Sequence, residues 1–341
     1  MGHNNVIGDD IIMKNNIARL AAAFACGIAL AVPIGASAYS QLTVFGDSLA
    51  DAGNVFIFTG GTFPPSPPYA QRLTNGPTAP EVLGANLGLP LTPSLAGGRD
   101  YAYGGAETGT GNFFSVYPLV PPLINQIFSG PPNYPATGTL AQVQGFNGTL
   151  APHSLTVLWT GPNDIFAAIF TGQDPSAVIG PAIGNIAQEI GLLYAAGAST
   201  ILVPNMANLG LIPFGLASGN SAGLTALTVG FNSLLGQTLT QLESMLPGLD
   251  IIGFDTFSFV DAAIANPAKY GFTNVTDPCF DGMNVCANPD QYIFWDTVHP
   301  TARSHQLLGN AFFAAVPEPE TLALVALAIP AMSFFRRRRI R

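Results

Sequence analysis

Positively charged residues are scarce in this sequence. It contains 11 lysines and arginines against 20 aspartates and glutamates in 341 residues, and seven of the 11 lie near the two ends of the chain. The body between the ends, residues 39–315, has four basic and sixteen acidic residues, a net charge of −12. Proteins that bind a phosphate backbone need clustered lysine and arginine. The composition therefore makes nucleic acid a poor partner and argues against a polyanionic substrate.

Cysteine is scarce too, with three in the chain. Cys26 falls in an N-terminal stretch that we expect to be removed, which leaves Cys279 and Cys286. These two lie seven residues apart in a loop-like stretch, and in an exported protein a disulfide is the leading interpretation. A zinc site would need more ligands, and no His or Cys pair with metal-ligand spacing lies nearby. We therefore expect no metal and no other cofactor.

Several catalytic motifs are also missing from the sequence. It has no G-x-x-x-x-G-K-[ST] phosphate loop and no H-E-x-x-H zinc site. The segment Gly215-Leu216-Ala217-Ser218-Gly219 places its serine one position too late for the G-x-S-x-G nucleophile elbow. These absences disfavour nucleotide phosphate transfer, zinc proteolysis and a standard α/β-hydrolase.

The first 38 residues have the pattern of a secretory signal peptide. Lys14 and Arg19 form a basic head, residues 20–34 form an apolar body, and Ala36-Ser37-Ala38 fits the small-residue rule for cleavage. We expect signal peptidase to cut after Ala38.

The last 26 residues, 316–341, have a matching pattern at the other end. Pro317-Glu318-Pro319 precedes an apolar run over residues 322–335 and four consecutive arginines at 336–339. The run is shorter than the roughly 20 residues that cross a bilayer comfortably, and the arginines would hold the tail on the cytoplasmic side. The tail resembles the PEP-CTERM sorting signal of Gram-negative bacteria. This resemblance implies transient anchoring in the inner membrane, processing by an exosortase, and extracellular release or display on the cell surface.

Apolar runs alternate with helical patterns along the remaining body, residues 39–315. Strands are predicted at residues 42–45, 155–159, 200–203 and 251–254, with a further extended piece at 99–103. Helices are predicted near residues 80–87, 140–146, 177–196, 222–246 and 301–313. This alternation is typical of a parallel sheet that helices cover on both faces. We therefore predict one α/β domain, a three-layer α/β/α sandwich with a mainly parallel central sheet.

Three predicted loops are longer than ordinary connections. They cover residues 60–98, which include the helix near 80–87, and residues 117–135 and 257–291. Loops of this length are often functional, so we expect them to form the walls of a substrate site.

The first strand leads directly to a candidate nucleophile. Residues 42–45 run into Gly46-Asp47-Ser48, ahead of a possible helix. Open α/β sheets bind ligands at the carboxyl ends of their strands, and helix N–H groups there favour developing negative charge. A serine hydroxyl is a weak nucleophile unless a base and an oxyanion site are brought to it. Ser48 is thus either a nucleophile or the cap of a helix, and other residues have to decide between the two.

One histidine is suited to act as the base for Ser48. His299 follows Asp296 by three residues, so their side chains can meet within a single turn. Asp296 would hold the Nδ1–H tautomer and leave Nε2 free to take the serine proton. His153 lies in a polar loop without an acidic neighbour, and His305 lacks such a partner. Asp296 and His299 could instead cap the helix expected from residue 301. Because Ser48 offers a nucleophile, we favour a catalytic role for the pair.

Acyl transfer also needs hydrogen-bond donors for an oxyanion. Gly104-Gly105-Ala106 follows the extended piece, and glycine lets backbone N–H groups point at a ligand. Asn163 follows the strand at 155–159 and offers a side-chain amide. The glycines could instead form only a tight turn, and Asn163 could form only an Asx turn. We favour donors because all these pieces follow strands at one edge of one sheet.

Four segments resemble, in order, the signature blocks of the GDSL family of serine esterases and lipases, also called SGNH hydrolases. They are Phe45-Gly46-Asp47-Ser48-Leu49-Ala50-Asp51-Ala52-Gly53-Asn54, Tyr101-Ala102-Tyr103-Gly104-Gly105-Ala106, Gly161-Pro162-Asn163-Asp164 and Asp296-Thr297-Val298-His299-Pro300. The blocks span nearly the whole body. The resemblance implies a flavodoxin-like SGNH hydrolase fold.

The same resemblance implies a role for each site residue. Ser48 would be the nucleophile, Asp296 and His299 would complete a triad, and Ser48, Gly105 and Asn163 would supply the oxyanion donors. Family members often have Asn where this chain has Asp100, five positions before the oxyanion glycine. That spacing selects Gly105 rather than Gly104, with Asp100 as a departure from the pattern.

The leading hypothesis is a secreted serine ester hydrolase that acts through an acyl-enzyme. The apolar residues of the long loops favour lipids or other apolar acyl esters as substrates. The first alternative is a carbohydrate O-acetylesterase of extracellular polysaccharide, because sorting tails of this kind are associated with extracellular matrix. The second is a non-catalytic surface or matrix protein that has kept the fold.

Overall fold

The computed structural model describes residues 39–116 and 136–317. The chain divides into Met1–Ala36 and Ser37–Arg341, and every described residue belongs to the second unit. The expected signal peptide, the predicted loop at 117–135 and the apolar run of the tail therefore lie outside the described residues. Within the described ranges, no helix has both the length and the apolar character needed to span a membrane.

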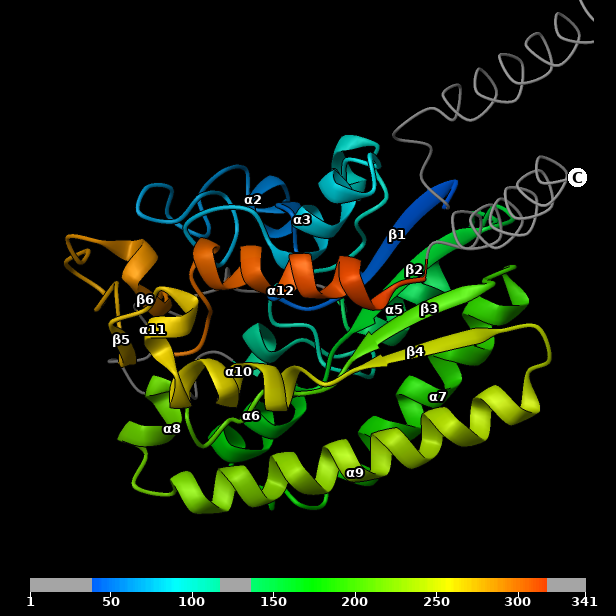
Figure 1. Cartoon of the computed structure of the whole chain (residues 1–341). Helices are drawn as coiled ribbons and strands as arrows, with labels where there is room; N and C mark the ends of the chain where they lie inside the picture. The colour runs from blue at the N-terminus through cyan, green and yellow to red at the C-terminus, as the bar shows by residue number, and fades with distance from the viewer. Residues whose placement is uncertain (1–38, 117–135, 318–341) are drawn as a thin grey trace, which may run out of the picture. The chain divides into compact units, whose positions relative to one another are not determined.

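Four parallel strands form the central sheet, in the order β1-β2-β3-β4 (Figure 1). They are β1 (Gln41–Gly46), β2 (Ser154–Trp159), β3 (Thr200–Pro204) and β4 (Asp250–Phe254). The predicted strands are confirmed, each to within one residue at either end. The predicted extended piece runs along the free edge of β1, where the N–H groups of Tyr101 and Tyr103 donate to the carbonyl oxygens of Val44 and Gly46.

Both faces of this sheet are apolar. Successive side chains on a strand point to opposite faces, so Val44 of β1 and Val157 of β2 join one core cluster, whereas Phe45 and Leu158 join another. All four side chains are at most 1% exposed. A sheet with two apolar faces is stable in water only when helices cover both of them.

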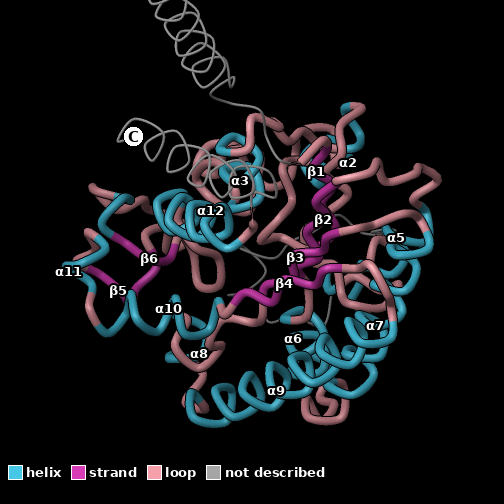
Figure 2. Tube along the Cα trace, turned by 45° about the vertical axis from the view of Figure 1, so that its right-hand side comes forward, coloured by secondary structure: helices cyan, strands magenta, loops and turns pink. Residues whose placement is uncertain are grey.

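Helices cover each face, as Figures 1 and 2 show. Helices α3 (Ala79–Asn86) and α12 (Ala302–Ala315) pack on the face of Val44. Helices α5 (Thr139–Gly145), α7 (Ile179–Ala195) and α9 (Ser221–Met245) pack on the face of Phe45. The predicted three-layer α/β/α sandwich is therefore confirmed.

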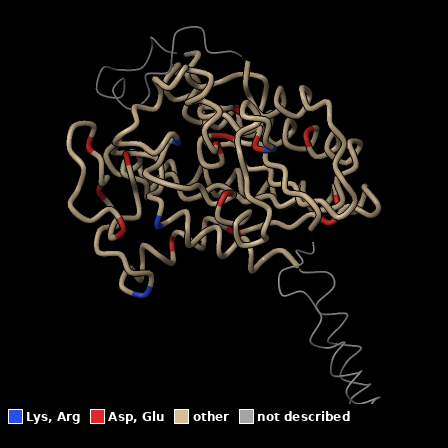
Figure 3. The backbone as a smooth tube through the Cα atoms, turned by 90° about the horizontal axis from the view of Figure 1, so that it is seen from above, with Lys and Arg blue, Asp and Glu red and all other residues tan. Residues whose placement is uncertain are grey.

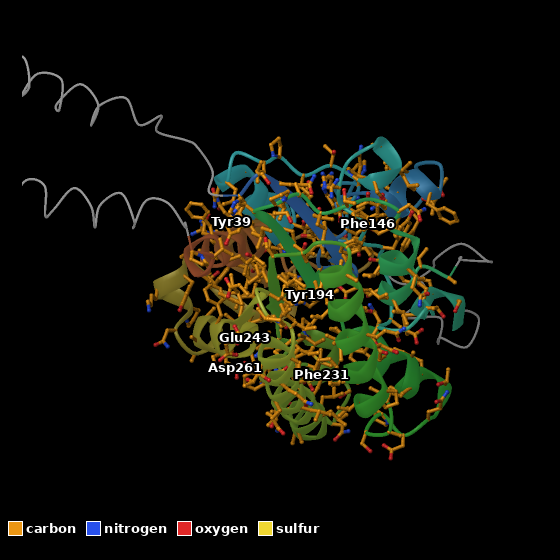
Figure 4. The ribbon with its side chains drawn as sticks, turned by 90° about the vertical axis from the view of Figure 1, so that its right-hand side faces the viewer. Tyr39, Phe146, Tyr194, Phe231, Glu243 and Asp261 are labelled. Carbon is orange, nitrogen blue, oxygen red and sulfur yellow. A yellow bond between two sulfur atoms is a disulfide. The ribbon has the colours of Figure 1, made fainter. Side chains whose placement is uncertain are left out.

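Helix α7 shows how the pattern of apolar residues places a helix on the sheet. Ile183, Ile186 and Ile190 recur at three- and four-residue spacing and are all buried, which gives α7 one apolar face. Phe231 on α9, labelled in Figure 4, is 1% exposed and belongs to the same core cluster. At the end of α7 the Tyr194 hydroxyl donates to the carbonyl oxygen of Pro247, beyond the end of α9.

The prediction of one long loop over residues 257–291 is wrong. The structure has there α10 (Thr256–Ala265), α11 (Pro267–Tyr270) and β5 (Asn274–Pro278), and β5 pairs in parallel with β6 (Tyr292–Phe294). Asn266 ends α10 and Pro267 begins α11, so neither helix is long enough to show a clear helical period. The other short elements are α2 (Asn54–Phe58), α6 (Pro162–Thr171), α8 (Pro213–Ala217), η1 (Ser94–Ala96), η2 (Phe113–Val116) and η3 (Pro289–Gln291).

Cys279 and Cys286 form a disulfide, as the sequence predicts. The bridge lies in a small apolar cluster with Phe280, Trp295 and Tyr69. This cluster is separate from the two clusters that cover the sheet, and it includes the residue directly before Asp296.

Several acidic side chains are buried, although cations are scattered thinly over the described residues (Figure 3). Glu189 on α7 is fully buried, and neither carboxyl oxygen has a hydrogen-bond partner among the described residues. Burial raises its pKa well above the usual value, and the charge of Asp164 adds to the shift. Burial also raises the pKa of Asp47 to about 7 and that of Asp51 to about 6. These groups therefore hold protons in the folded state at pH values where the unfolded chain releases them.

Stability should therefore fall as the pH rises. A carboxyl group whose pKa is higher in the folded state stabilises the fold below its unfolded pKa of about 4, and that contribution is lost as the pH passes through the folded pKa. Between pH 5 and pH 8 we expect the free energy of unfolding to drop by at least about 4 kcal/mol, because each pH unit below a folded pKa is equivalent to about 1.4 kcal/mol and Asp47 and Asp51 together cover about three such units. Glu189→Gln, which is neutral at every pH, should reduce the drop, whereas the exposed Glu243→Gln should leave it unchanged. Denaturant titrations of the three proteins at both pH values would contradict this if stability rose with pH.

Candidate active site

Ser48 lies in a turn directly after β1. A Cβ on Gly46 would lie 2.4 Å from the carbonyl oxygen of Trp159, so only glycine lets the end of β1 approach β2 this closely. Gln142 of α5 also holds Gly46 in place. Its side chain accepts a hydrogen bond from the Gly46 N–H and donates one to the Gly46 carbonyl oxygen. The helix expected from Ser48 onward is not present: residues 48–50 form a turn, and α2 begins at Asn54. Sheet geometry, rather than a helix terminus, therefore fixes the serine.

His299 and Asp296 lie in the turn between β6 and α12. The His299 Nε2 atom is 2.9 Å from the Ser48 Oγ atom, and Nδ1 is 2.8 Å from Oδ2 of Asp296. The backbone N–H groups of Val298 and His299 donate to Oδ1 of Asp296 at 2.8 and 2.7 Å. Helix α12 is capped by Thr301, which accepts from the N–H of Ser304, so the pair does not serve as its cap. The structure brings the three predicted residues into one hydrogen-bonded chain.

The surroundings of Asp296 favour its ionised form. The carboxyl group is fully buried, and burial alone would raise its pKa. The neighbouring His299 ring and the two backbone N–H groups outweigh that effect, so the pKa of Asp296 lies below its usual value. An ionised carboxylate beside Nδ1 keeps the proton on that nitrogen and leaves Nε2 as the acceptor for the serine hydroxyl.

The Gly104-Gly105 turn lies beside Ser48 and presents one free N–H group. The Gly104 N–H donates to Oδ2 of Asp51 at 2.9 Å, so it is occupied. The Gly105 N–H has no hydrogen-bond partner among residues 39–116 and 136–317, and Gly105 lines the same hollow as Ser48. Of the two glycines in the predicted motif, Gly105 is therefore the one whose N–H group can bind a ligand.

Asn163 offers a second donor at this place. It lies in the first turn of α6, directly after β2, and is 7% exposed. One proton of its amide is used by the carbonyl oxygen of Ala106, at 2.9 Å from Nδ2. A side-chain amide carries two protons, so the second remains for a ligand. The contact with Ala106 fixes this amide next to the Gly105 turn.

An apolar hollow opens beside Ser48 and His299. Its walls come from segments that are far apart in the sequence. Three of these segments follow the Gly105 turn, β3 and β4. The apolar lining residues are Leu49, Phe113, Phe114, Trp159, Pro162, Phe166, Ala207, Leu209, Ile212, Val260, Ile293, Phe294, Val298, Pro300 and Leu308. The predicted loop at 60–98 contributes no lining residue to this hollow, and within the described residues of 257–291 only Val260 of α10 does so.

The other two histidines of the body do not join the site. His153 is exposed in the loop before β2, as expected. His305 is buried on α12, where its Nδ1 accepts from the N–H of Ala79 at 3.1 Å. It therefore joins α12 to α3.

Two contacts of the site have no signal in the sequence. The Tyr69 hydroxyl donates to Oδ2 of Asp296 at 2.8 Å, although 227 residues separate them. Asp51 accepts from Gly53, Asn54 and Val55 as well as Gly104, and so joins the Ser48 turn to the Gly105 turn. Asp51 belongs to the first sequence block, but its partner at Gly104 is visible only in the fold.

A serine, a histidine and an aspartate joined by hydrogen bonds at the carboxyl edge of a parallel sheet, next to free amide donors, are the parts of a serine hydrolase site. Residues 42–312 match the family model described as GDSL-like lipase/acylhydrolase, and the chain belongs to this family. Residues 315–339 match the PEP-CTERM protein-sorting motif.

Named relatives of this chain include proteins of bacteria and plants. It is 28% identical to an "Uncharacterized protein in trpE-trpG intergenic region" of Pseudomonas putida over 92% of this chain and 54% of the relative, so it spans about half that relative's length. It is 24% identical to GDSL esterase/lipase 6 of Arabidopsis thaliana, over 81% and 87% of the two chains. An Arabidopsis thaliana protein named "Inactive GDSL esterase/lipase-like protein 25" is 27% identical over 81% and 72%.

A solved structure is similar as well. It is a member of the lipolytic protein G-D-S-L family from Veillonella parvula DSM 2008, with 14% sequence identity and a TM-score of 0.41 over 79% of this chain and 94% of that one.

The Gly105 turn should tolerate no side chain. Gly105 has φ of +77°, and a Cβ there would lie 2.5 Å from Asn112 Oδ1 and 2.7 Å from the Phe114 ring. Gly105→Ala should therefore lower the free energy of unfolding by about 2–4 kcal/mol. Gly88→Ala is the matched control, because Gly88 has φ of +70° and nothing within 4 Å of the added carbon; we expect about 1 kcal/mol there. Equal losses in denaturant titrations would contradict the steric argument.

Proposed function

We propose that this protein is an exported serine carboxylic-ester hydrolase that acts through an acyl-enzyme on esters with apolar acyl chains. The observation that carries the proposal is the hydrogen-bonded chain from Ser48 through His299 to Asp296, with 2.9 and 2.8 Å between the paired atoms. Membership of the GDSL-like lipase/acylhydrolase family supports ester hydrolysis as the reaction.

In the acylation step, the Ser48 Oγ atom attacks the carbonyl carbon of the ester while His299 Nε2 takes the hydroxyl proton. Asp296 stabilises the imidazolium that forms. The carbonyl oxygen becomes an oxyanion, which accepts hydrogen bonds from the Ser48 and Gly105 N–H groups and the Asn163 amide. When the carbonyl re-forms, the bond to the alcohol oxygen breaks, and His299 returns its proton to the leaving alcohol.

Deacylation repeats these steps with water as the nucleophile. His299 removes a proton from the water as its oxygen attacks the acyl carbon, and the same donors hold the second oxyanion. The bond to the Ser48 Oγ atom then breaks, and His299 returns the proton to the serine. The products are a carboxylic acid and the free enzyme.

The hollow supports an apolar acyl chain as the group that is bound. Apolar side chains, chiefly phenylalanine, leucine, isoleucine and valine, make up most of its wall next to Ser48. Burying a methylene against such a wall contributes about 0.8 kcal/mol. An acetyl group is too small to contact most of this apolar surface.

The C-terminal motif supports export of this protein from the cytoplasm. Residues 315–339 match the PEP-CTERM sorting motif, and we propose processing by an exosortase after transient anchoring in the membrane. The disulfide between Cys279 and Cys286 fits an oxidising compartment.

Substitution of the nucleophile tests the reaction. Ser48→Ala should lower the kcat for a chromogenic ester by at least about 10⁴-fold and abolish labelling by a fluorophosphonate probe. The Ser48 hydroxyl has one hydrogen-bond partner, His299, among the described residues, so the melting temperature should change little. Ser218→Ala is the control, because Ser218 lies in the off-register Gly215–Gly219 segment and outside the hollow. Full activity of Ser48→Ala would contradict Ser48 as the nucleophile. A wild-type protein that neither cleaves the ester nor reacts with the probe would favour a non-catalytic surface protein.

A series of p-nitrophenyl esters tests the acyl group. From acetate to longer chains, kcat/KM should rise about 4-fold per added methylene until the hollow is full. Ala207→Leu, which narrows the hollow, should lower kcat/KM for long esters more than for acetate, whereas Ala217→Leu, on the exposed end of α8, should change neither. Acetylated xylan belongs in the same panel. Faster cleavage of that polymer than of every longer acyl ester would instead identify a carbohydrate O-acetylesterase.

A further inference from the structure

Tyr69 makes a hydrogen bond to the carboxylate at the end of the triad. Its hydroxyl donates to Oδ2 of Asp296 at 2.8 Å, and the same oxygen accepts from His299 Nδ1 at 2.8 Å. Among the described residues, Tyr69 and His299 are the only side chains that bond to Asp296. The four side chains from Tyr69 to Ser48 therefore form one continuous chain of hydrogen bonds.

The Tyr69 ring is held in place from two sides. It is 5% exposed and meets Phe280 edge to face at 5.7 Å and Trp295 edge to face at 6.0 Å between ring centroids. Phe280 and Trp295 stack on each other, and the Cys279–Cys286 disulfide belongs to the same cluster. Because the ring is fixed by packing, its hydroxyl can fix the carboxylate.

The direction of this hydrogen bond follows from the burial. Burial raises the pKa of Tyr69 well above its usual value, and the negative charge of Asp296 adds to the shift. The hydroxyl therefore keeps its proton throughout the neutral range and acts as the donor, while the ionised carboxylate is the acceptor. A charge-assisted bond of this kind is stronger than one between neutral groups.

We propose that Tyr69 is a positioning residue of the catalytic triad, which holds the Asp296 carboxylate in plane with Nδ1 of His299 and draws part of its negative charge away from the imidazole. This inference rests on the proposed ester hydrolysis. It adds a fourth side chain to the chemistry, from a segment that contributes nothing to the apolar hollow.

Removal of the hydroxyl should change kcat and leave KM unchanged. In Tyr69→Phe one carboxylate oxygen loses a donor, so Asp296 holds the histidine less rigidly, and we expect kcat to fall about 10-fold. KM should stay within about 2-fold, because Tyr69 lies outside the hollow that binds the acyl chain. A carboxylate with one donor fewer also attracts the imidazolium more strongly. The acid limb of the pH profile of kcat/KM should therefore move to higher pH.

Tyr292→Phe is the matched control. Tyr292 packs against the same aromatic cluster, but its hydroxyl makes no hydrogen bond to Asp296. It should keep the wild-type kcat and pH profile. If both variants lose activity equally, with lower melting temperatures and no movement of the acid limb, Tyr69 is only a structural member of the cluster and the proposal is wrong.

A spectroscopic measurement keeps the test independent of turnover. The chain has four histidines, so the ring N–H signals of protein labelled with ¹⁵N-histidine can be assigned by substitution. The His299 Nδ1–H proton resonance should move in Tyr69→Phe and stay in place in Tyr292→Phe. An unchanged resonance in Tyr69→Phe overturns the inference whether or not the protein hydrolyses esters. Absence of esterase activity in the wild type, with the resonance shifted as expected, would overturn the proposed function alone.

Discussion

The hydrogen bond between Ser48 and His299 joins two turns that are 251 residues apart, and the rest of the molecule sets its length. On one side, the close approach of Gly46 to Trp159 fixes where β1 ends. On the other, the backbone of the Asp296–His299 turn is tied down because the Trp295 N–H donates to the His299 carbonyl oxygen at 2.7 Å. A shift of 1 Å in either turn would break the bond, since it weakens steeply beyond about 3.2 Å. The sheet and α12 therefore act as the frame of the proton transfer that we propose between Ser48 and His299.

The central sheet and the triad could be predicted because their signals are local. Each strand is an apolar run bounded by polar residues, and Asp296 and His299 are three positions apart. Contacts between segments that are far apart in the sequence have no local signal of this kind. Tyr69 gives no hint of its partner at Asp296, and the helices α10 and α11 are too short for their periods to be read. The helix expected at Ser48 failed because the Asp47 side chain accepts from the Leu49 N–H and closes a local turn instead.

The shortage of cations shapes how this protein holds its buried carboxylates. Within the described residues, Arg72 with Glu81 is the one ion pair that joins a lysine or arginine to a carboxylate. Asp51 is instead surrounded by four backbone N–H groups, and Asp296 by two together with Tyr69 and His299. Backbone dipoles in a packed interior do not reorient, so they stabilise a charge at one fixed place. In this acidic protein, backbone N–H groups therefore take the place of side-chain cations around Asp51 and Asp296.

In this protein the fold and the proposed chemistry are separable, because few of the contacts that stabilise the fold involve Ser48 or His299. The Ser48 hydroxyl bonds only to His299 among the described residues, and the sheet is held by apolar clusters on both faces. A chain could lose the serine and keep nearly all of its core, which fits the existence of a relative named as inactive. Asp296 is different: it accepts two backbone N–H groups of its own turn as well as the Tyr69 hydroxyl. Its loss would leave those donors buried without a partner, at a cost of about 1–3 kcal/mol for each donor that finds no water. In this protein, the Asp296 carboxylate is therefore the one member of the Ser48–His299–Asp296 chain on which both the proposed reaction and the local fold depend.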